Sequence, residues 1–368
     1  MSLNVGIVGL PNVGKSTLFN ALTGAQNAEA ANYPFCTIEP NKATVPVPDD
    51  RLAVLAALAG PEKITHAVVD FIDIAGLVRG ASTGEGLGNQ FLGNIRDCSA
   101  VLEMVRCFDD DNIIHVNGCA DPLRDMEIVE TELLLADLQS VEKRLEKVKR
   151  AAKGDKAAQA LHESLEALRG HLNKGLPAAS FAAPVGETLR QSLGEQGLLT
   201  AKKIIYCANI DEGAVGNPEA VPHVRALLRH AAGTGRESVI VCAKIEEELQ
   251  GLSKAEQVEL LHAYGIKESA LAQVIRCGFK SLGLTNFFTA GPKEVRAWTI
   301  TGGSRAPQAA GVIHGDFERG FIRAEVTAYE DYIRLGSEAA ARAAGLLRIE
   351  GKEYVVKDGD VMHFLFNV

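Results

Sequence analysis

The chain has 368 residues, a formal net charge of −9, and a composition of 46% hydrophobic and 23% charged residues, which is ordinary for a soluble globular protein. This length exceeds one ordinary hydrophobic core and indicates two or three domains. The acidic balance excludes a global attraction to nucleic acid, so any contact with RNA requires a local basic patch.

Short runs rich in β-branched residues alternate with helical patterns along much of the chain. Five of these runs are predicted to be buried strands of a parallel sheet: Leu3–Val8, Ala67–Ile72, Ala100–Val105, Lys203–Cys207 and Ser238–Val241. Several of them end at a polar or glycine-rich segment. Open α/β sheets bind their ligands beyond the carboxyl ends of the strands, so we expect a binding site at this edge.

The first of these segments, Gly9–Ser16, has the sequence GLPNVGKS and matches the P-loop pattern GxxxxGK[ST]. It follows a predicted strand and precedes a predicted helix, Thr17–Leu22. Its backbone N–H groups and the helix dipole would hold phosphates, Lys15 would reach the β- and γ-phosphates, and the Ser16 hydroxyl would coordinate Mg²⁺. The predicted nucleotide contacts here are Asn12, Val13, Gly14, Lys15, Ser16 and Thr17.

A second motif, Asp73-Ile74-Ala75-Gly76, follows the strand Ala67–Ile72. An aspartate at this position can hold Mg²⁺, directly or through water. The Gly76 amide can meet the γ-phosphate, so Lys15 and Gly76 are the predicted catalytic groups. Between the two motifs, Thr37 lies where a loop threonine would complete the Mg²⁺ shell, although spacing alone leaves that role open.

A long helical insertion separates the third and fourth predicted strands. Leucine and valine recur at heptad spacing in two stripes, one at Leu134, Leu138, Val141, Leu145 and Val148, the other at Ala158, Leu161, Leu165, Leu168 and Leu172. A short polar turn, Lys153–Asp155, joins the stripes. The pattern favours an antiparallel coiled-coil hairpin, and the alternative is an amphipathic pair packed on the main domain.

The pattern of predicted strands and helices changes from about residue 281. The segments Val295–Ile300, Phe321–Val326 and Tyr354–Val356 are predicted strands, divided by glycine-containing turns and by an alanine-rich helical segment. These features indicate a small α+β domain.

Together these motifs resemble the YchF group of Obg-related P-loop proteins. The resemblance rests on GLPNVGKST, NYPFCTIEPN and DIAGLVRGASTGEGLGNQFL, and continues through Asn112–Gly118, Asn209–Glu212, Ala243–Glu246 and the stretch from Phe288 to the C-terminus. It implies an α/β Ras-like P-loop NTPase domain over residues 1–280, with the helical hairpin inserted at about 121–200. It further implies a C-terminal TGS domain, an α+β β-grasp fold, over 281–366.

The resemblance also implies that Ser16 and Thr37 are Mg²⁺ ligands, with Asp73 as the third metal-binding residue predicted from the motifs. Members of the group associate with ribosomes and hydrolyse ATP, and often GTP less well. The partners expected for this chain are therefore ATP, GTP more weakly, and the ribosome or its large subunit including ribosomal RNA, with neither DNA nor membrane.

The residues expected to read the base are Asn209, Ile210 and Glu212. Guanine-specific relatives use N-K-x-D, in which the aspartate accepts two hydrogen bonds from guanine. Here Ile210 replaces the lysine and Glu212 replaces the aspartate, which should spoil that bidentate geometry. Asn209 can contact adenine or hold the P-loop in place. The residues favour a lost guanine preference, and the resemblance favours ATP.

The residue that positions the attacking water is not evident. Ras-like enzymes carry a glutamine directly after the DxxG glycine, and this chain has Leu77 there, which predicts a slow intrinsic rate. Nearby polar candidates are Arg79, Ser82, Thr83 and Glu85. His115 is a further candidate, although a lone histidine after a strand is more often structural.

A basic cluster lies near the expected hairpin tip. Residues 142–156 contain Lys143, Arg144, Lys147, Lys149, Arg150, Lys153 and Lys156 against three acidic residues. This cluster could contact ribosomal RNA phosphates, or it could be a solvated helix face.

The distribution of cysteines and apolar residues bears on location. The seven cysteines include no CxxC pair, which argues against a disulfide framework or a zinc site and fits a reducing cytosol. The N-terminal residues do not form a signal-peptide pattern, and no run reaches the ~18 apolar residues of a membrane span. We therefore expect a cytoplasmic Mg²⁺-dependent nucleoside triphosphatase switch. A nucleotide-binding scaffold with negligible turnover is the alternative, and a P-loop kinase is a weaker third possibility.

Overall fold

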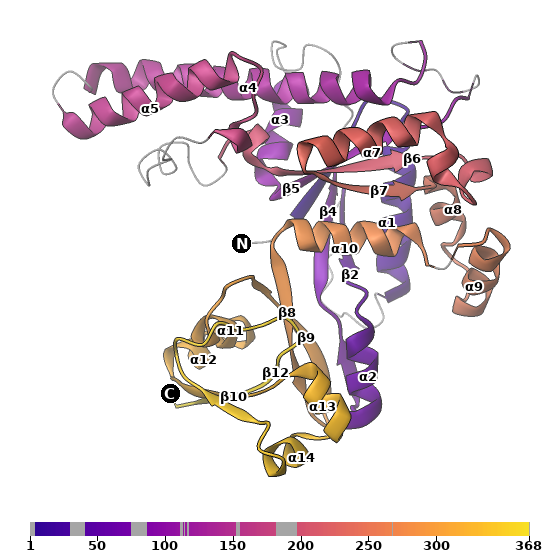
Figure 1. Cartoon of the computed structure of the whole chain (residues 1–368), viewed down its shortest axis with the longest axis vertical. Coiled ribbons are helices and arrows are strands. Elements are labelled where there is room, and N and C mark those ends of the chain that lie inside the picture. Colours follow the sequence, from indigo (N-terminus) through magenta and orange to yellow (C-terminus); the bar gives the residue numbers. More distant parts are fainter. Residues whose placement is uncertain are drawn as a thin grey trace. The chain divides into compact units, whose positions relative to one another are not determined.

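The computed structural model of the chain describes residues 4–29, 41–74, 87–110, 113, 115, 118–151, 155–181, 197–266 and 268–367 (Figure 1). Two compact units make up the structure. The first comprises Met1–Ala25, Ile38–Ala43 and Asp70–Val274, and the second comprises Gln26–Thr37, Thr44–Val69 and Ile275–Val368. Within the described residues, no helix is both long enough and apolar enough to cross a membrane.

A six-stranded sheet forms the centre of the first unit, with the strand order β2-β4-β1-β5-β6-β7. In that order the strands are Lys42–Pro46, Val68–Asp73, Asn4–Val8, Ala100–Arg106, Lys203–Asn209 and Glu237–Val241. β1 pairs in parallel with β4 and β5, and the parallel pairing continues through β6 to β7. The five strands predicted from sequence are confirmed, and β2 adds an edge strand that the sequence patterns did not predict.

The central strand β5 is buried along its whole length. Helices α4 (Pro122–Ala151) and α7 (Pro222–Thr234) pack on β5, β6 and β7 (Figure 1). Glu103 is 1% exposed, and neither of its carboxylate oxygens has a hydrogen-bond partner in the described part of the chain. Burial raises the pKa of Glu103 well above its usual value, the nearby Glu130 raises it further, and Arg236 opposes them. This strand therefore holds a carboxyl group whose ionisation the surrounding fold opposes.

The other helices that the structure describes in the first unit are shorter than α4. They are α1 (Lys15–Glu29), which begins in this unit, α3 (Leu87–Asp97), α5 (Lys156–Leu172), α8 (Ala243–Glu248), α9 (Lys254–Ala263) and the start of α10 (Ala270–Ser281). Short 3-10 helices among the described residues accompany them: η2 (Ala178–Ser180), η3 (Leu199–Ala201), η4 (Glu212–Ala214) and η5 (Pro218–Ala220).

Helices α4 and α5 form the predicted antiparallel hairpin, which extends beyond the sheet of the first unit (Figure 1). Its core contains Val141 and Leu145 of α4 together with Leu165 and Leu168 of α5, and both predicted stripes contribute to it. Where the chain returns toward the sheet, the buried Asp137 carboxylate accepts hydrogen bonds from the N–H groups of residues 199 and 200, at 2.7 and 2.8 Å. These bonds fasten the base of the hairpin.

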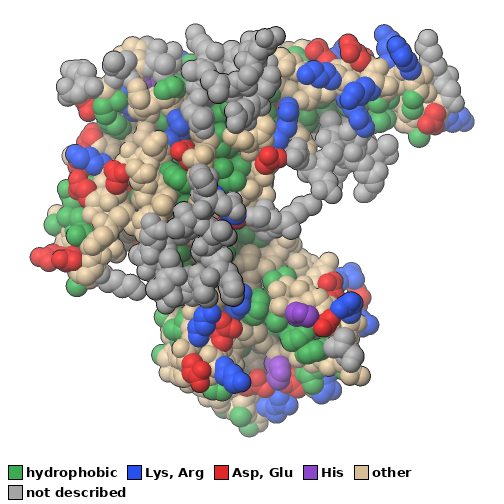
Figure 2. All heavy atoms as spheres, turned by 180° about the vertical axis from the view of Figure 1, so that it is seen from behind, with side chains coloured by type: hydrophobic (Ala, Val, Ile, Leu, Met, Phe, Trp, Pro, Cys, Tyr) green, Lys and Arg blue, Asp and Glu red, His purple; other side chains and the backbone are tan. Residues whose placement is uncertain are grey.

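Figure 2 shows the charged side chains of this hairpin from the opposite side, with basic and acidic groups both on its surface. Lys143, Lys147, Lys149, Arg150 and Lys156 are exposed, and Lys153 lies outside the described residues. The predicted tip is therefore solvent-facing where the structure describes it.

The second unit is built on a mixed sheet with the strand order β11-β10-β12-β8-β9-β3. In that order the strands are Arg348–Glu350, Phe321–Thr327, Val361–Phe366, Leu284–Ala290, Glu294–Thr301 and Lys63–Thr65. β8 pairs antiparallel with β9 and parallel with β12, which pairs antiparallel with β10. This arrangement is the predicted β-grasp fold.

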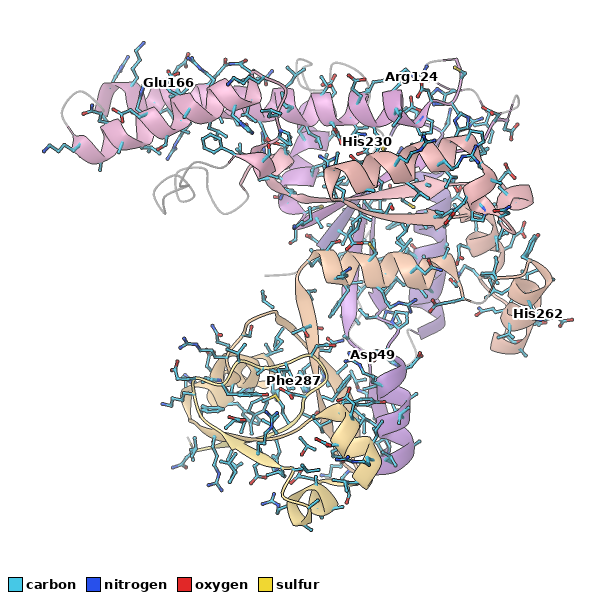
Figure 3. All side chains as sticks on the ribbon, in the orientation of Figure 1. Asp49, Arg124, Glu166, His230, His262 and Phe287 are labelled. Carbon is cyan, nitrogen blue, oxygen red and sulfur yellow. The ribbon has the colours of Figure 1, made fainter. Side chains whose placement is uncertain are left out.

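Short helices complete the second unit: α2 (Asp50–Ala59), α11 (Ala306–Ile313), α12 (Gly315–Arg319), α13 (Tyr329–Leu335) and α14 (Glu338–Ala343). α11 packs against β9 and β10 over a core in which Phe287 is fully buried (Figure 3). α2 packs against β8, β9 and α13, and β3 pairs in parallel with β9.

Two features of this unit differ from the sequence predictions. Tyr354–Val356 forms no strand, because turns flank it on both sides and it makes only the single bridge between Arg305 and Val355. Residues 44–69, which the boundary at 280 would assign to the N-terminal domain, group with the C-terminal residues, because β3 and α2 find their partners there.

Candidate nucleotide site

The P-loop has a backbone that two glycines make possible. Gly9 has φ of 149° and Gly14 has φ of 101°, both in a region that side chains rarely adopt. A Cβ atom at position 9 would collide with the Met104 carbonyl oxygen, and one at position 14 would collide with the Asn209 side chain. β1 ends at Val8 and α1 begins at Lys15, so the loop has the strand–loop–helix context that the motif requires.

The Lys15 side chain folds back over this loop. Its ammonium group donates to the carbonyl oxygens of Gly9 at 3.0 Å and Leu10 at 2.7 Å. The residue is 8% exposed, and burial lowers the pKa of Lys15 to about 8, an effect that the nearby Asp73 carboxylate opposes. A buried cation satisfied mainly by carbonyl groups favours an approaching anion, so the loop has the charge and the geometry of a phosphate site.

Asp73 lies at the end of β4, opposite Ile7 of β1. Its backbone N–H donates to the Asn41 carbonyl at 2.9 Å. Burial raises the pKa of Asp73, and the nearby Lys15 opposes this shift, so these two side chains lie in one site. Ser16 lies exposed in the first turn of α1. A carboxylate and a hydroxyl are hard oxygen donors, which fit Mg²⁺.

The remaining predicted groups around the γ-phosphate lie outside the described residues. They are the metal-binding candidate Thr37, the catalytic candidate Gly76, and Leu77, Arg79, Ser82, Thr83 and Glu85.

Asn209 connects three parts of the site. Its side-chain amide donates to the Val13 carbonyl in the P-loop at 2.9 Å, and its side-chain oxygen accepts from the Ala243 N–H at 3.1 Å. The residue is 5% exposed. Of the two roles open from the sequence, contact with the base or support of the P-loop, these hydrogen bonds belong to the second.

Ile210 and Glu212, which follow Asn209, differ in their exposure and in the groups that they already contact. Ile210 is 4% exposed, and its N–H donates to the Val241 carbonyl at 2.9 Å, so this N–H is already engaged. Glu212 begins the 3-10 helix η4 and forms an ion pair with Lys244 of α8. The hydrogen bond from Lys244 lowers the pKa of Glu212.

Two contacts of the Ala243–Glu246 segment had no predicted role. One is the pairing of Lys244 with Glu212. The other is Glu246, which is 2% exposed and accepts hydrogen bonds from the Ser269 hydroxyl at 2.6 Å and the Ala270 N–H at 2.7 Å, where α10 begins. The segment was recognisable as a motif. Its contacts with Glu212, Ser269 and Ala270 were not predictable, because these residues lie more than 20 positions away and belong to common residue types.

His115 lies buried beside helix α4. Its Nε2 atom is 2.9 Å from the Asp125 carboxylate. The Arg106 guanidinium donates to the carbonyl groups of Phe108, Asp110 and Ile113. In this structure His115 is therefore held by the first turn of α4.

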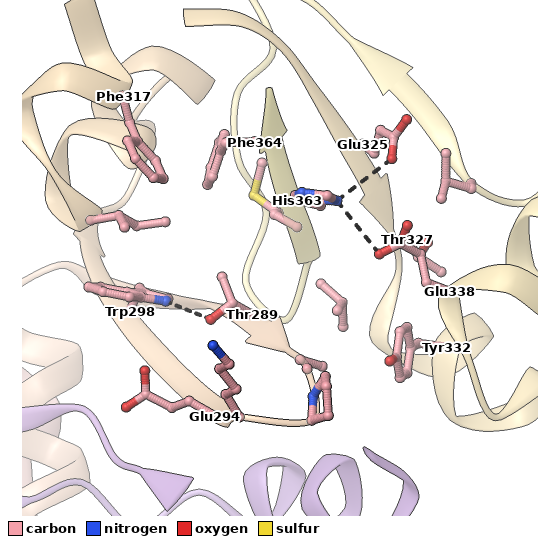
Figure 4. Close-up of a pocket in the computed structure, with 18 of the residues that line it drawn as sticks. Thr289, Glu294, Trp298, Phe317, Glu325, Thr327, Tyr332, Glu338, His363 and Phe364 are labelled. Atoms are coloured by element: carbon pink, nitrogen blue, oxygen red, sulfur yellow. Dashed lines mark hydrogen bonds and ion pairs between the residues drawn. The ribbon is translucent and has the colours of Figure 1, made fainter. Parts of the chain in front are cut away.

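A second group of ionisable side chains lies in the second unit, beside a hollow of about 610 Å³ (Figure 4). The donor atoms of Glu325, Glu338 and His363 lie within 4.8 Å of one another, a spacing that a metal ion could use. Arg342 donates to Glu325 at 2.7 Å and to Glu338 at 3.1 Å. A guanidinium of the chain itself therefore already binds both of these carboxylates.

Comparison with known proteins agrees with the geometry of both units. Residues 4–152 match a family model described as "50S ribosome-binding GTPase", and residues 284–367 match the model YchF-GTPase_C, described as "Protein of unknown function (DUF933)".

Whole-chain relatives extend this match. The chain is 51% identical to "Ribosome-binding ATPase YchF" of Bacillus subtilis and 50% identical to the protein of that name in Escherichia coli O157:H7, each over 100% of both chains. The solved structure of the YchF GTPase of Schizosaccharomyces pombe superposes with a TM-score of 0.88 at 38% identity, covering 99% of this chain and 98% of the other. The sequence, the P-loop geometry and the two-unit fold therefore lead to one conclusion: this chain belongs to the YchF family.

Proposed function

We propose that this chain is a Mg²⁺-dependent nucleoside triphosphatase that hydrolyses ATP, and GTP less well, and that it binds the ribosome as a translation-associated switch in the cytoplasm. The relatives named "Ribosome-binding ATPase YchF" support ATP hydrolysis and ribosome binding. The observation in the molecule that carries the proposal is the buried Lys15 ammonium, held over the P-loop beside Asp73.

The roles proposed for the site residues follow from this placement. Lys15 would leave the carbonyls of Gly9 and Leu10 and bind the β- and γ-phosphates, with backbone N–H groups of residues 12–17 around them. Ser16, Thr37 and Asp73 would hold Mg²⁺, which neutralises charge on those phosphates. The Gly76 amide would contact the γ-phosphate. Asn209 acts as a positioning residue that keeps the P-loop in shape.

ATP is the proposed substrate because the guanine-reading features are missing or engaged. Ile210 is buried, so a lysine at this position would place an ammonium in the core rather than over a base. Glu212 carries an extra methylene and is paired with Lys244. Neither residue presents the two free acceptors that guanine needs.

A nucleotide-binding scaffold with negligible turnover is the second candidate, and Leu77 in place of a water-positioning glutamine favours it. Steady-state hydrolysis of ATP and GTP, with and without ribosomes, separates the two functions. We expect slow turnover of ATP, slower turnover of GTP, and a change in rate on adding ribosomes. If no turnover is measured in any condition, the scaffold function is the one that remains.

The phosphate assignment has its own test in Lys15→Ala, which should abolish tight triphosphate binding in calorimetry. Lys203→Ala is a matched control, because this exposed lysine is the first residue of β6 and Asn209 is the last. Unchanged ATP affinity in Lys15→Ala would refute the assignment.

A further inference from the structure

We infer that Lys244 is a specificity-determining residue that keeps Glu212 from reading guanine. The inference rests on the proposed nucleotide site and deepens it. No motif assigns a role to Lys244, and the structure alone places it against the glutamate.

The position of Lys244 relative to the P-loop is fixed by Asn209. One end of the Asn209 side chain binds Val13 in the P-loop, and the other binds the Ala243 N–H, directly before Lys244. The same residue ends β6, three residues before Glu212. The ion pair therefore lies at the P-loop end of the sheet, where the base of a bound nucleotide is expected.

The Glu212 carboxylate is ionised and occupied. Its side chain is 33% exposed, whereas that of Lys244 is 64% exposed, so the lysine reaches in from solvent to meet the carboxylate. The pairing acts on both groups, since the pKa of Glu212 is lowered and that of Lys244 is raised by their hydrogen bond. Glu212 can accept from a base only by giving up or sharing this ammonium.

Guanine and adenine respond differently to such a carboxylate. Guanine offers two donors, its N1–H and its 2-amino group. A free aspartate accepts both, and a free Glu212, one methylene longer, would accept from them with poorer geometry. Adenine has no hydrogen at N1 and no amino group at C2, so it gains nothing from that acceptor pair. An ammonium bound to the carboxylate thus removes an interaction that only guanine would use, which is discrimination against the wrong ligand.

The test is Lys244→Met, with ATP and GTP affinities measured by calorimetry on the full chain. Freeing Glu212 should strengthen GTP binding about two- to fivefold relative to ATP binding, the range expected for losing one exposed ion pair. Lys203→Met, an exposed lysine at the far end of β6, is the matched control and should leave the GTP-to-ATP ratio unchanged.

A second variant ties the effect to the carboxylate. Glu212→Gln combined with Lys244→Met should return the ratio to that of the unmodified protein. An unchanged ratio in Lys244→Met, or an equal loss for both nucleotides, would overturn the inference. Failure of the unmodified protein to bind ATP would instead overturn the proposed function, so the two failures are distinguishable.

Discussion

Lys15 holds its positive charge in an unfavourable place. Burial lowers the pKa of its ammonium to about 8, while two carbonyl oxygens and the Asp73 carboxylate retain it in position. Phosphate groups brought next to this ammonium favour its charged form, so binding must raise the pKa again. Proton uptake is then coupled to nucleotide binding.

The pH dependence of ATP affinity follows from this coupling. Below about pH 7 the free protein already carries the proton on Lys15, and affinity should be flat with pH. Above about pH 8 the free Lys15 loses its proton, so affinity should fall by up to about tenfold per pH unit. Calorimetry in buffers of different ionisation enthalpy should show proton uptake approaching one per ATP near pH 9, and none would contradict the assignment.

Glu103 shows the opposite shift and makes a prediction about stability. Its raised pKa means that the folded chain keeps a proton that the unfolded chain loses above its usual value of 4.5. The free energy of unfolding should therefore fall as pH rises from about 4.5 toward the raised pKa. The Glu103→Gln side chain has no proton to lose. Over the same pH range, its free energy of unfolding should therefore rise relative to that of the original protein by up to about 1.4 kcal/mol per pH unit.

Urea unfolding of both proteins at about pH 5, 6.5 and 8 measures this difference. A constant difference across the three conditions would mean that Glu103 ionises normally in the folded chain.

How far the site follows from sequence depends on how local each feature is. The P-loop was predictable, because Gly9, Gly14 and Lys15 act through spacing within one loop and the strand before it. The hydrogen bond from Asn209 to the Val13 carbonyl joins residues 196 positions apart, so the sequence left two roles open for Asn209. The pairing of Lys244 with Glu212 was missed because it depends on two segments meeting after strands β6 and β7.

The hairpin is the element that combines an apolar seam with a charged surface. Val141, Leu145, Leu165 and Leu168 fill the seam, while the basic side chains near the turn face solvent. Reversal of those side chains therefore leaves the seam intact and should cost little stability.

Changing Lys147, Lys149 and Arg150 to glutamate should weaken ribosome association and flatten its salt dependence, because fewer phosphate contacts release fewer counterions. ATP hydrolysis by the isolated protein should stay near normal. Co-sedimentation with ribosomes at several salt concentrations measures both effects. If the reversed protein pellets as the original does at every salt level, the tip is a solvated face and the contact lies elsewhere, with the C-terminal domain next to be tested.

A matched control reverses Lys174, Lys203 and Arg229, three exposed basic residues of the same unit that lie outside the tip segment. It changes the net charge equally, so an equal loss of binding would point to overall charge rather than to the tip.

Element predictions succeeded where the periodic pattern was long and failed where it was short. The stripes of α4 and α5 span several turns, and the five predicted parallel strands are short runs rich in apolar and β-branched residues, so pattern alone identified them. Tyr354–Val356 has strand-like residues but lies between two turns. β3 has only three residues, and its pairing of Ile64 with Val295 is invisible in the local sequence.

At the scale of the whole molecule, the second unit brings residues 44–69 together with the C-terminal stretch, two segments that lie far apart in the chain. Arg51 of α2 holds them together: it donates to Asp49 at 2.8 Å and to Asp358 at 2.7 Å, and its guanidinium lies 5.1 Å from the Phe288 ring centre. Asp358 in turn accepts from the Asn286 N–H at 3.0 Å. One planar cation thus links the helix, a turn and a strand.

Arg51→Met should destabilise the second unit by about 1–3 kcal/mol, because two carboxylates lose a charged partner. Arg51→Lys should recover only part of this, since lysine lacks the planar fork that spans both. Hydrogen exchange of the β8 and β9 amides reports on this unit. Arg334→Met, which removes an exposed pair within α13, is the control and should change little; equal effects of the two variants would argue against the link.

The pairing of β3 with β9 also has a consequence for how the chain is made. Thr65 pairs with Arg296, so β3 leaves the ribosome about 230 residues before its neighbour does. At about 5–20 residues per second, that gap amounts to roughly 10–50 seconds of synthesis. During this interval β3 and helix α2 have no sheet to join. Leu52 and Leu55 of α2, which are fully buried in the folded protein, then lack the residues that bury them. Completion of the second unit is therefore a late event in synthesis, and a nascent chain stopped before residue 284 should remain open to proteolysis within residues 44–69.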